Sequence, residues 1–152
     1  MSGFLTKHFG ELPAQPEVEF EFPGGLPGFE ARRRFVPLHF ERSDPLIFLQ
    51  SLEDPDLCFL TVPVLAVDAR YRLGVEPEDL EVIGLPGDRQ PRIGKEVLCL
   101  AVLSIYAEGA TANLLAPLVV NLKTGKAVQA VRTDSRYSHQ HPMVSEETPV
   151  CS

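Results

Sequence analysis

Proline and glycine interrupt this chain along its whole length, and no other feature limits its fold as strongly. The 152 residues include 14 prolines and 11 glycines, scattered rather than gathered in one linker. Proline lacks the backbone N–H that a helix or a central strand needs, and glycine favours turns. The uninterrupted segments are therefore short, which favours a mostly β domain with many turns over a bundle of long helices.

Several of these short segments have the composition and the alternation of β-strands. Apolar and polar residues alternate with a period of two where one face of a strand is buried, and continuous apolar runs are typical of strands covered on both faces. The run that begins at residue 96 is the longest of them. Pro63 is expected to end the strand at residues 57–62, because proline has no backbone N–H to donate to a neighbouring strand. The predicted strands are residues 18–22, 34–40, 46–52, 57–62, 96–106, 118–122 and 127–131.

The segments between these strands give weaker signals. The last two strands are expected to form a hairpin, with Gly125 in its turn available for a positive φ. Pro77, followed by acidic residues, favours the first turn of a short helix, and a strand beginning near Leu80 is the alternative. Residues 110–116 fit one helical turn or a loop. The polar segment after Thr133 is expected to be ordered only in part.

Short segments joined by short links leave no room for repeated βαβ crossovers. An antiparallel sheet that closes into a barrel, or a sandwich, removes most exposed strand edges. With 44% hydrophobic residues, a chain of this length can bury a core without metals or disulfides. The expected fold is therefore mostly β: a single-domain, antiparallel, β-barrel-like fold with one or two short helical turns.

The charge of the chain bears on its partners. The formal net charge is −7, and the only compact basic cluster, Arg32-Arg33-Arg34, follows Glu30. Proteins that bind nucleic acid normally carry a basic patch that neutralises phosphates. Direct binding to nucleic acid is therefore disfavoured, whereas an acidic surface suits a basic protein partner.

The spacing of the cysteines and the absence of long apolar runs indicate in which cellular compartment the protein works. Cys58, Cys99 and Cys151 are odd in number and far apart, which matches neither a disulfide framework nor a zinc site. Cys58 and Cys99 lie in apolar runs and are expected to be buried. No apolar run approaches the roughly 20 residues that cross a bilayer. The first residues contain no long apolar segment, so a secretory signal is not expected. The expectation is a cytoplasmic protein that does not enter the membrane.

No catalytic or metal-binding template fits the sequence. It contains no glycine-rich phosphate loop and no dinucleotide fingerprint. His139 and His141 form the only close histidine pair and lack a third ligand. Glu53 and Asp54 precede a proline and are explained by a turn. No catalytic residue, metal or cofactor is expected, and the protein is predicted not to be an enzyme.

Three stretches resemble one family, the bacterial flagellar assembly factor FliW. Residues 21–30, EFPGGLPGFE, are similar to its opening F-P-x-G-I/L-P-G-F. Residues 45–59, PLIFLQSLEDPDLCF, are close to its L-Q-S-x-x-x-P-x-L-x-F segment. Residues 111–121, TANLLAPLVVN, are very near its T-A-N-L-L-A-P-I-V-I-N signature. The further matches, in the expected order, are Gln129-Ala130-Val131, Ser135-Arg136-Tyr137-Ser138 and His141-Pro142-Met143.

The resemblance covers residues 17–143 and also has departures. Residues 62–67 stand where the family usually has an aromatic-rich stretch, and Gln140 stands where a basic residue is common. The implied organisation is an N-terminal extension (1–16), a FliW-like β domain (17–143) and a flexible C-terminal tail (144–152).

The resemblance implies a function without catalysis. Members of the family bind CsrA, a small dimeric RNA-binding translational repressor, and relieve its repression of flagellin synthesis. Flagellin that accumulates before export captures FliW and frees CsrA again. The implied partners are therefore CsrA and flagellin, and the acidic charge suits a protein that docks near the basic RNA-binding surface of CsrA, although inhibition from a separate site is equally open.

Candidate partner-binding residues are of three kinds. Exposed aromatic side chains dominate interface hot spots. An acidic stretch can meet a basic partner, although such a stretch is usually a solvated face. Two asparagines flank an apolar stretch, where a turn cap and a strand end are the ordinary explanations. The candidates are Phe29, Tyr71 and Tyr106 (if exposed), Glu76, Glu78, Asp79 and Glu81, and Asn113 and Asn121.

A small-ligand-binding β-barrel is the alternative function. It predicts a deep apolar cavity, and a filled interior would discard it. A hydrolase would need converging histidine, cysteine or carboxylate groups, of which the sequence offers no set.

Overall fold

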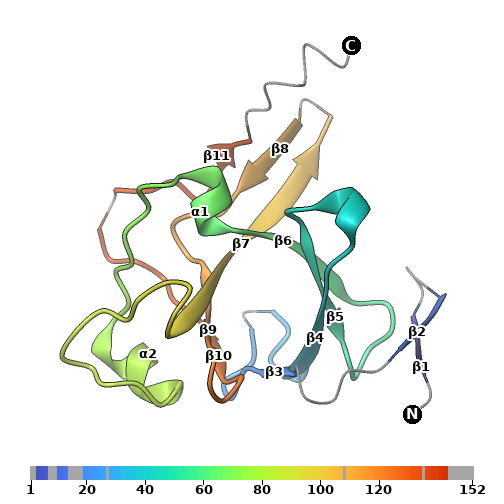
Figure 1. Cartoon of the computed structure of the whole chain (residues 1–152), viewed down its shortest axis with the longest axis horizontal. Helices are drawn as coiled ribbons and strands as arrows, with labels where there is room; N and C mark the ends of the chain where they lie inside the picture. Colours follow the sequence, from blue (N-terminus) through green and yellow to red (C-terminus); the bar gives the residue numbers. More distant parts are fainter. Residues whose placement is uncertain are drawn as a thin grey trace.

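One long, mostly antiparallel sheet curls into a half-barrel and organises the molecule (Figure 1). The computed structural model describes residues 3–6, 10–13, 19–26, 28–107, 109–134 and 136–143. The strands of the curled sheet are β3 (Phe20–Glu21), β4 (Arg34–Leu38), β5 (Ile47–Ser51), β6 (Cys58–Pro63), β7 (Val97–Tyr106), β8 (Gly109–Ala112), β9 (Leu118–Asn121), β10 (Ala127–Gln129) and β11 (His141–Pro142).

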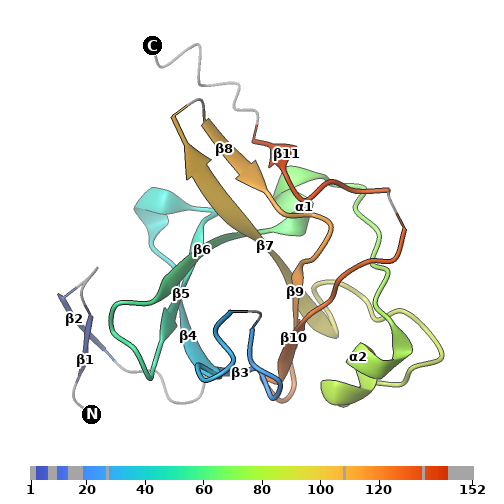
Figure 2. The ribbon, with the colours of Figure 1, turned by 180° about the vertical axis from the view of Figure 1, so that it is seen from behind.

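The sheet runs in the order β10-β9-β7-β6-β5-β4-β3, and its two ends approach each other. The Glu21 N–H on β3 donates to the Gly125 carbonyl oxygen at 2.9 Å, and Glu21 forms a parallel bridge with Lys126. The terminal strand therefore meets the turn of the β9–β10 hairpin, as the view from behind also shows (Figure 2). The predicted barrel-like fold is confirmed in this curled form.

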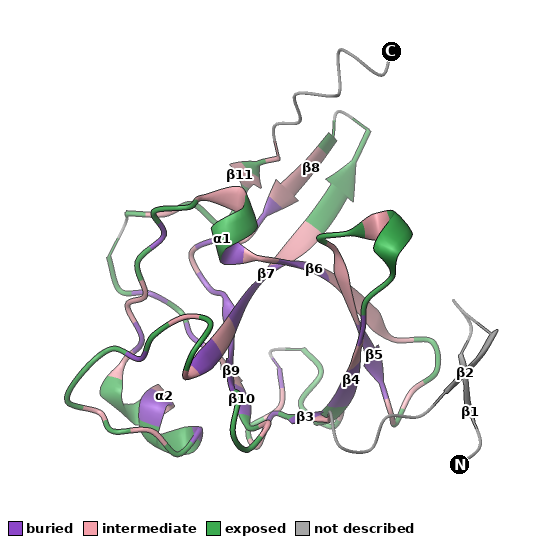
Figure 3. Ribbon diagram, viewed as in Figure 1, coloured by how far each residue is buried: buried purple, intermediate pink, exposed green. Residues whose placement is uncertain are grey.

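Strand β7 belongs to two parts of the sheet. Its first half, from Val97 to Leu100, pairs with β9, and its last four residues pair with β8, which in turn pairs with β11. Burial follows this division, since the first half is buried and the end is exposed (Figure 3). The end of β7 thus carries β8 and β11 away from the curl.

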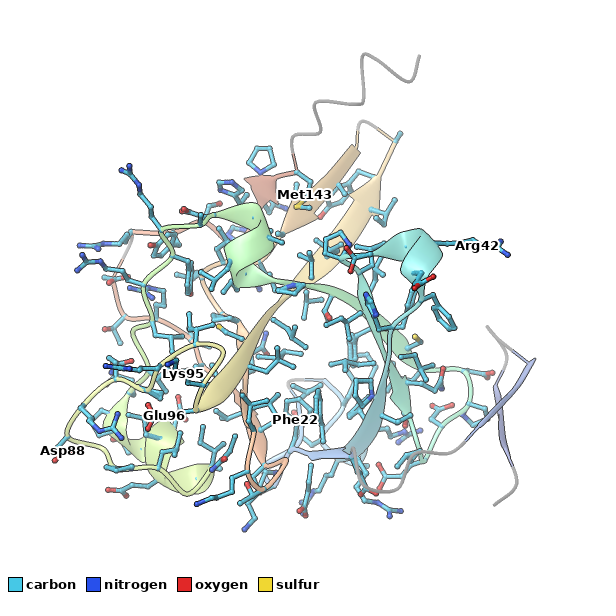
Figure 4. The ribbon with its side chains drawn as sticks, in the orientation of Figure 1. Phe22, Arg42, Asp88, Lys95, Glu96 and Met143 are labelled. Carbon is cyan, nitrogen blue, oxygen red and sulfur yellow. The ribbon has the colours of Figure 1, made fainter. Side chains whose placement is uncertain are left out.

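Alternation along β7 separates two hydrophobic clusters. Cys99 and Ala101 pack in one cluster, which lies between the sheet and the two short helices, while Leu100 packs in the other. The second cluster fills the inside of the curl, where Phe22 lies (Figure 4) and contacts Phe35 edge-on at 5.7 Å between ring centroids. Successive strand residues point to opposite faces, so one strand supplies both clusters.

The remaining elements are short. The helices are α1 (Val64–Val67), α2 (Pro77–Val82) and the 3-10 turn Glu41–Ser43; β1 (Gly3–Thr6) and β2 (Gly10–Pro13) form a separate two-stranded sheet. The predicted helix at Pro77 is confirmed and begins with that proline, so the alternative strand near Leu80 is wrong. The hairpin is confirmed as well, with φ +83° at Gly125.

The structure corrects one detail of the sequence-based prediction and adds to two others. Residues 110–116 do not form a helical turn or only a loop, because β8 extends to Ala112 along the free end of β7. Pro63 ends β6, as expected; it is the last residue of the strand, pairs with Leu100, and α1 follows at once. Part of the segment after Thr133 joins the sheet as β11. Residue 18, Cys151 and residues 144–152 lie outside the described residues.

The two described cysteines have the environments expected of structural residues. Cys99 is buried and Cys58 is partly buried, and both are free. Burial raises the pKa of Cys58 to about 11 and that of Cys99 to about 12. Since the thiolate is the reactive form of cysteine, neither thiol is activated.

Candidate functional site

The proline- and glycine-rich turn after β3 places one aromatic ring at the surface. Gly25 N–H donates to the Phe22 carbonyl at 2.8 Å and Phe29 N–H to the Leu26 carbonyl at 2.7 Å. Gly25 has φ +73°, and a Cβ there would lie 2.6 Å from the Glu30 backbone, so the turn requires glycine. Leu26 is thereby buried in the inner cluster, whereas Phe29 stays 41% exposed.

Phe29 borders a hollow of about 240 Å³ on the open side of the curl. Its ring lies edge-on to that of Phe59, with 5.5 Å between centroids. Tyr106, 47% exposed, lines the other side, and its hydroxyl accepts a hydrogen bond from Gln140 Nε2 at 3.4 Å. We call this concave surface, with Gln129 and Asn113 also on its wall, the aromatic hollow.

The two candidate asparagines have structural roles, as the ordinary explanations predict. Asn113 Oδ1 accepts hydrogen bonds from the N–H groups of Leu115 at 3.1 Å and Ala116 at 2.9 Å, which caps a turn. Asn121 is buried at the end of β9, where its Nδ2 donates to the Ile83 carbonyl at 2.7 Å and its Oδ1 accepts from Lys123 N–H at 2.8 Å. Of the two, only Asn113 reaches the aromatic hollow.

Replacing Asn121 with alanine is expected to lower the free energy of unfolding by about 2 kcal/mol, since the buried Ile83 carbonyl loses its partner. Asn113→Ala is the matched control and should cost about 1 kcal/mol, because its turn is only partly buried. Urea denaturation at neutral pH measures both. A smaller loss for Asn121→Ala than for Asn113→Ala would contradict the tether between β9 and the end of α2.

The acidic candidates gather on α2. Leu80 points into the core, while Glu78 and Glu81 are exposed and Asp79 is partly buried. Burial raises the pKa of Asp79, and the nearby charges of Glu78 and Glu76 add to the shift. The carboxylates are thus close enough to repel one another, and no basic residue lies in the last turn of the helix.

This helix and the aromatic hollow form one continuous face. Asp79 and Val82 of α2 border a groove with Gly24 and Glu30, of about 550 Å³. Leu26 and Gln129 line both that groove and the aromatic hollow. The face therefore combines exposed aromatic rings with one edge of α2, and it holds Phe29, Tyr106, Asn113 and, of the acidic candidates, Asp79.

Tyr71 is the exception among the candidate anchors, since it is only 5% exposed. Its hydroxyl donates to the Leu114 carbonyl at 2.9 Å, and burial raises its pKa to about 12. Its ring lies 4.4 Å from that of Tyr137. Tyr71 was a candidate only if exposed, and it is buried. It instead joins its own segment to those of Leu114 and Tyr137.

Two of the three arginines in the compact basic cluster, by contrast, have their charges paired with nearby carboxylates. Arg32 pairs with Asp54 at 3.3 Å, and Arg34 lies 3.8 Å from a carboxylate oxygen of Glu53. The Arg33 N–H donates to the same Glu53 side chain at 2.7 Å. Glu53 and Asp54 therefore hold a turn together, as the sequence predicts.

The described residues offer little to a cofactor or a metal. Among them no group of three histidine, cysteine or acidic side chains is arranged to hold a metal ion. Large side chains such as Phe35 and Leu49 are fully buried inside the curl, so its interior does not favour the ligand-binding alternative. In the part of the chain that the structure describes, no helix has the length and apolarity to cross a membrane.

The sequence-based candidates did not include Phe59, Gln129 and Gln140, which are among the residues that line the aromatic hollow. They come from β6, β10 and the segment before β11, and only the curl brings them together. The sequence did single out two of them, because Gln129 begins a matched stretch and Gln140 departs from the family pattern. Without the pairing register of the strands, however, neither residue could be assigned to a face of the sheet.

Comparison with known proteins gives a consistent result. The family model described as "FliW protein" matches residues 4–143. The flagellar assembly factor FliW of Heliobacterium modesticaldum is 35% identical over 136 residues, covering 90% of this chain and 86% of the relative. FliW of Bacillus subtilis is 30% identical over 141 residues, covering 93% and 96%. A crystal structure of the flagellar assembly factor FliW superposes with a TM-score of 0.80 at 27% identity and covers 96% of this chain and 99% of that one.

Proposed function

This chain belongs to the FliW family of flagellar assembly factors, and from that premise we propose that it binds a CsrA-type translational regulator and flagellin in mutually exclusive complexes. Bound to this protein, the regulator no longer represses flagellin synthesis. Flagellin that accumulates captures the protein and returns the regulator to its RNA. The protein thus acts in the cytoplasm, by binding and without catalysis.

One observation carries this proposal: the acidic helix α2 borders, through Asp79 and Val82, the groove that adjoins the aromatic hollow. A regulator that holds RNA is basic at its RNA-binding surface, so Glu78 and Glu81 suit it electrostatically. Phe29 and Tyr106 supply the exposed rings that act as anchors in protein interfaces. A bound acidic helix near the RNA site also raises the electrostatic cost of RNA binding.

The test is a titration of the full chain against CsrA from the same organism, by calorimetry, repeated with flagellin added. Flagellin is expected to release CsrA, and CsrA to weaken flagellin binding by the same factor, because linkage makes the exclusion reciprocal. Simultaneous binding of both partners would contradict the switch, and recovery of neither partner would remove the proposal.

Reversing charge on α2 separates the acidic surface from the fold. Glu78→Lys combined with Glu81→Lys is expected to weaken CsrA binding about 10-fold or more, which equals about 1.4 kcal/mol. Both side chains are exposed, so stability should change little. The control is Glu41→Lys, at an exposed glutamate of the 3-10 turn, which changes the net charge by half as much and lies far from α2 (Figure 1). If the control loses half or more of the binding free energy that the double variant loses, the effect is one of net charge alone.

A further inference from the structure

A second concave surface shares no lining residue with the acidic face, and its chemistry is the opposite. A groove of about 570 Å³ runs between α1, the segment after it and the loop that leads into β7. Leu65, which is 41% exposed, Leu73 and Ile93 make its surface apolar. Arg72, Arg92 and Lys95 stand around it. We call it the basic groove.

Side-chain bonds to the backbone hold the two walls of the basic groove together. Gln90 pairs with the Val75 main chain in both directions: its Oε1 accepts from the Val75 N–H at 2.9 Å, and its Nε2 donates to the Val75 carbonyl at 3.0 Å. Arg72 is fixed by its N–H, which donates to the Tyr137 hydroxyl at 3.0 Å, and by its carbonyl, which accepts from Arg132 at 2.5 Å. The groove is therefore formed without a ligand, which lowers the entropic cost of binding.

The cations of the basic groove form no close ion pair within the part of the chain that the structure describes, although the charge of Arg92 helps to lower the pKa of Glu96. Arg72, Arg92 and Lys95 are exposed, and within the described ranges none of their side chains forms a salt bridge with a carboxylate. Glu96, the next residue, is held by Arg89 at 3.0 and 2.6 Å and by the Arg92 N–H at 2.8 Å. These bonds lower the pKa of Glu96 to about 2, so its charge is already matched by Arg89.

We propose that the basic groove binds an extended acidic peptide segment of a partner protein, with one apolar side chain seated between Leu65 and Ile93. Arginine binds carboxylates through two parallel hydrogen bonds, and Arg72 and Arg92 are placed on either wall to do so. This surface is distinct from the face proposed for the regulator and flagellin, because the two share no lining residue.

Nucleic acid is a poorer occupant of the same groove. The chain has a net charge of −7, which opposes a phosphate backbone, charged at every nucleotide, more strongly than a short peptide with a few carboxylates. Single strands also need exposed aromatic rings on which bases stack, whereas the one aromatic side chain on this groove, Tyr71, is buried. Aliphatic side chains instead match an aliphatic residue of a peptide.

A binding assay tests the proposal. The full chain is titrated into a fluorescein-labelled pentapeptide that has one leucine flanked on each side by two glutamates, and anisotropy is recorded. Saturable binding is expected, and it should weaken as salt rises, because the Debye length falls from about 10 Å at 0.1 M to about 3 Å at 1 M. A peptide with glutamines in place of the glutamates should bind at least 10-fold more weakly.

Protein variants locate the site. Arg92→Glu combined with Lys95→Glu is expected to weaken peptide binding at least 10-fold, while Arg42→Glu is expected to leave it unchanged. Arg42 is exposed and lies on the opposite side of the molecule from Lys95 (Figure 4). Leu65→Ser should weaken binding several-fold through the apolar contact. The Arg92 bond to Glu96 is made by the backbone N–H, so the reversal keeps it.

Three results would overturn the proposal: no saturable binding of the acidic peptide, equal weakening by Arg42→Glu, or preferential binding of a labelled single-stranded RNA at the same residues. If the charge-reversed protein does not fold, the glutamine peptide still decides the role of charge. Titration of CsrA against the Arg92→Glu, Lys95→Glu protein keeps this test apart from the proposed function, since that binding is expected to be retained.

Discussion

Replacing Gly125 with alanine is expected to lower the free energy of unfolding by about 3 kcal/mol or more, the larger part of it from one steric contact. Gly125 has φ +83°, a conformation that costs an L-residue about 1–2 kcal/mol. A Cβ there would also lie 2.4 Å from the Glu19 carbonyl oxygen. A backbone atom cannot rotate away from this contact, so the hairpin or β3 has to move. That movement would break the bond from Glu21 N–H to the Gly125 carbonyl, which joins the two ends of the sheet.

Gly94→Ala is the matched control. Gly94 has a similar φ of +90°, but a Cβ there would have no heavy atom within 4 Å. It should lose only the conformational cost of about 1–2 kcal/mol. Urea denaturation of both variants measures the difference, and the midpoint of thermal unfolding of Gly125→Ala should fall by about 10 °C. Equal losses at the two positions would mean that φ alone matters and that the approach of Glu19 does not.

Features that depend on neighbouring residues could be predicted from the sequence. Alternation and apolar runs placed β4, β5, β6 and β7, since the period of two is a property of the strand itself. Pro77 predicted the start of α2 because its missing N–H is harmless in the first turn. Gly125 predicted the hairpin turn for a similarly local reason. Asn113 and Asn121 have the turn and strand-end roles that were the ordinary explanation.

Features that depend on distant parts of the chain could not be predicted. Strand β8 has little strand-like pattern, and it pairs because β7 extends beyond β9 and leaves an edge free. Tyr71 was a candidate anchor by residue type. Its hydroxyl, however, donates a hydrogen bond to the carbonyl of Leu114, which is distant in the sequence and keeps the tyrosine buried. The aromatic hollow depends on the curl, which joins Phe29 to Tyr106 and Gln140. Local composition therefore located the candidate residues, and the topology decided which of them share a face.

Arg132→Met is expected to lower the free energy of unfolding by about 2–4 kcal/mol. Arg132 joins the segment after β10 to the segment around Tyr71 and Arg72. Its side chain is 5% exposed. Its Nη1 donates to the Arg72 carbonyl at 2.5 Å, and its guanidinium lies 4.8 Å from the ring centroid of Tyr137 and 5.6 Å from that of Tyr71. A hydrogen bond from a charged group contributes about 1.5–3 kcal/mol, and each cation–π contact about 0.5–2 kcal/mol. Methionine keeps much of the volume and loses both interactions.

Asp134→Asn identifies which partner matters. Asp134 accepts hydrogen bonds from Arg132 at 2.9 and 3.0 Å, but its side chain is 52% exposed, so solvent screens the pair. The asparagine variant should therefore show only a minor part of the loss seen with Arg132→Met. Arg132 also lowers the pKa of Asp134, so what the pair contributes is present above the ordinary aspartate pKa and is lost as pH falls through the lowered value. Urea denaturation of both variants at neutral and acidic pH measures this. If Asp134→Asn were as costly as Arg132→Met, the ion pair would hold the segment, and the Arg72 carbonyl and the two tyrosine rings would have no special role.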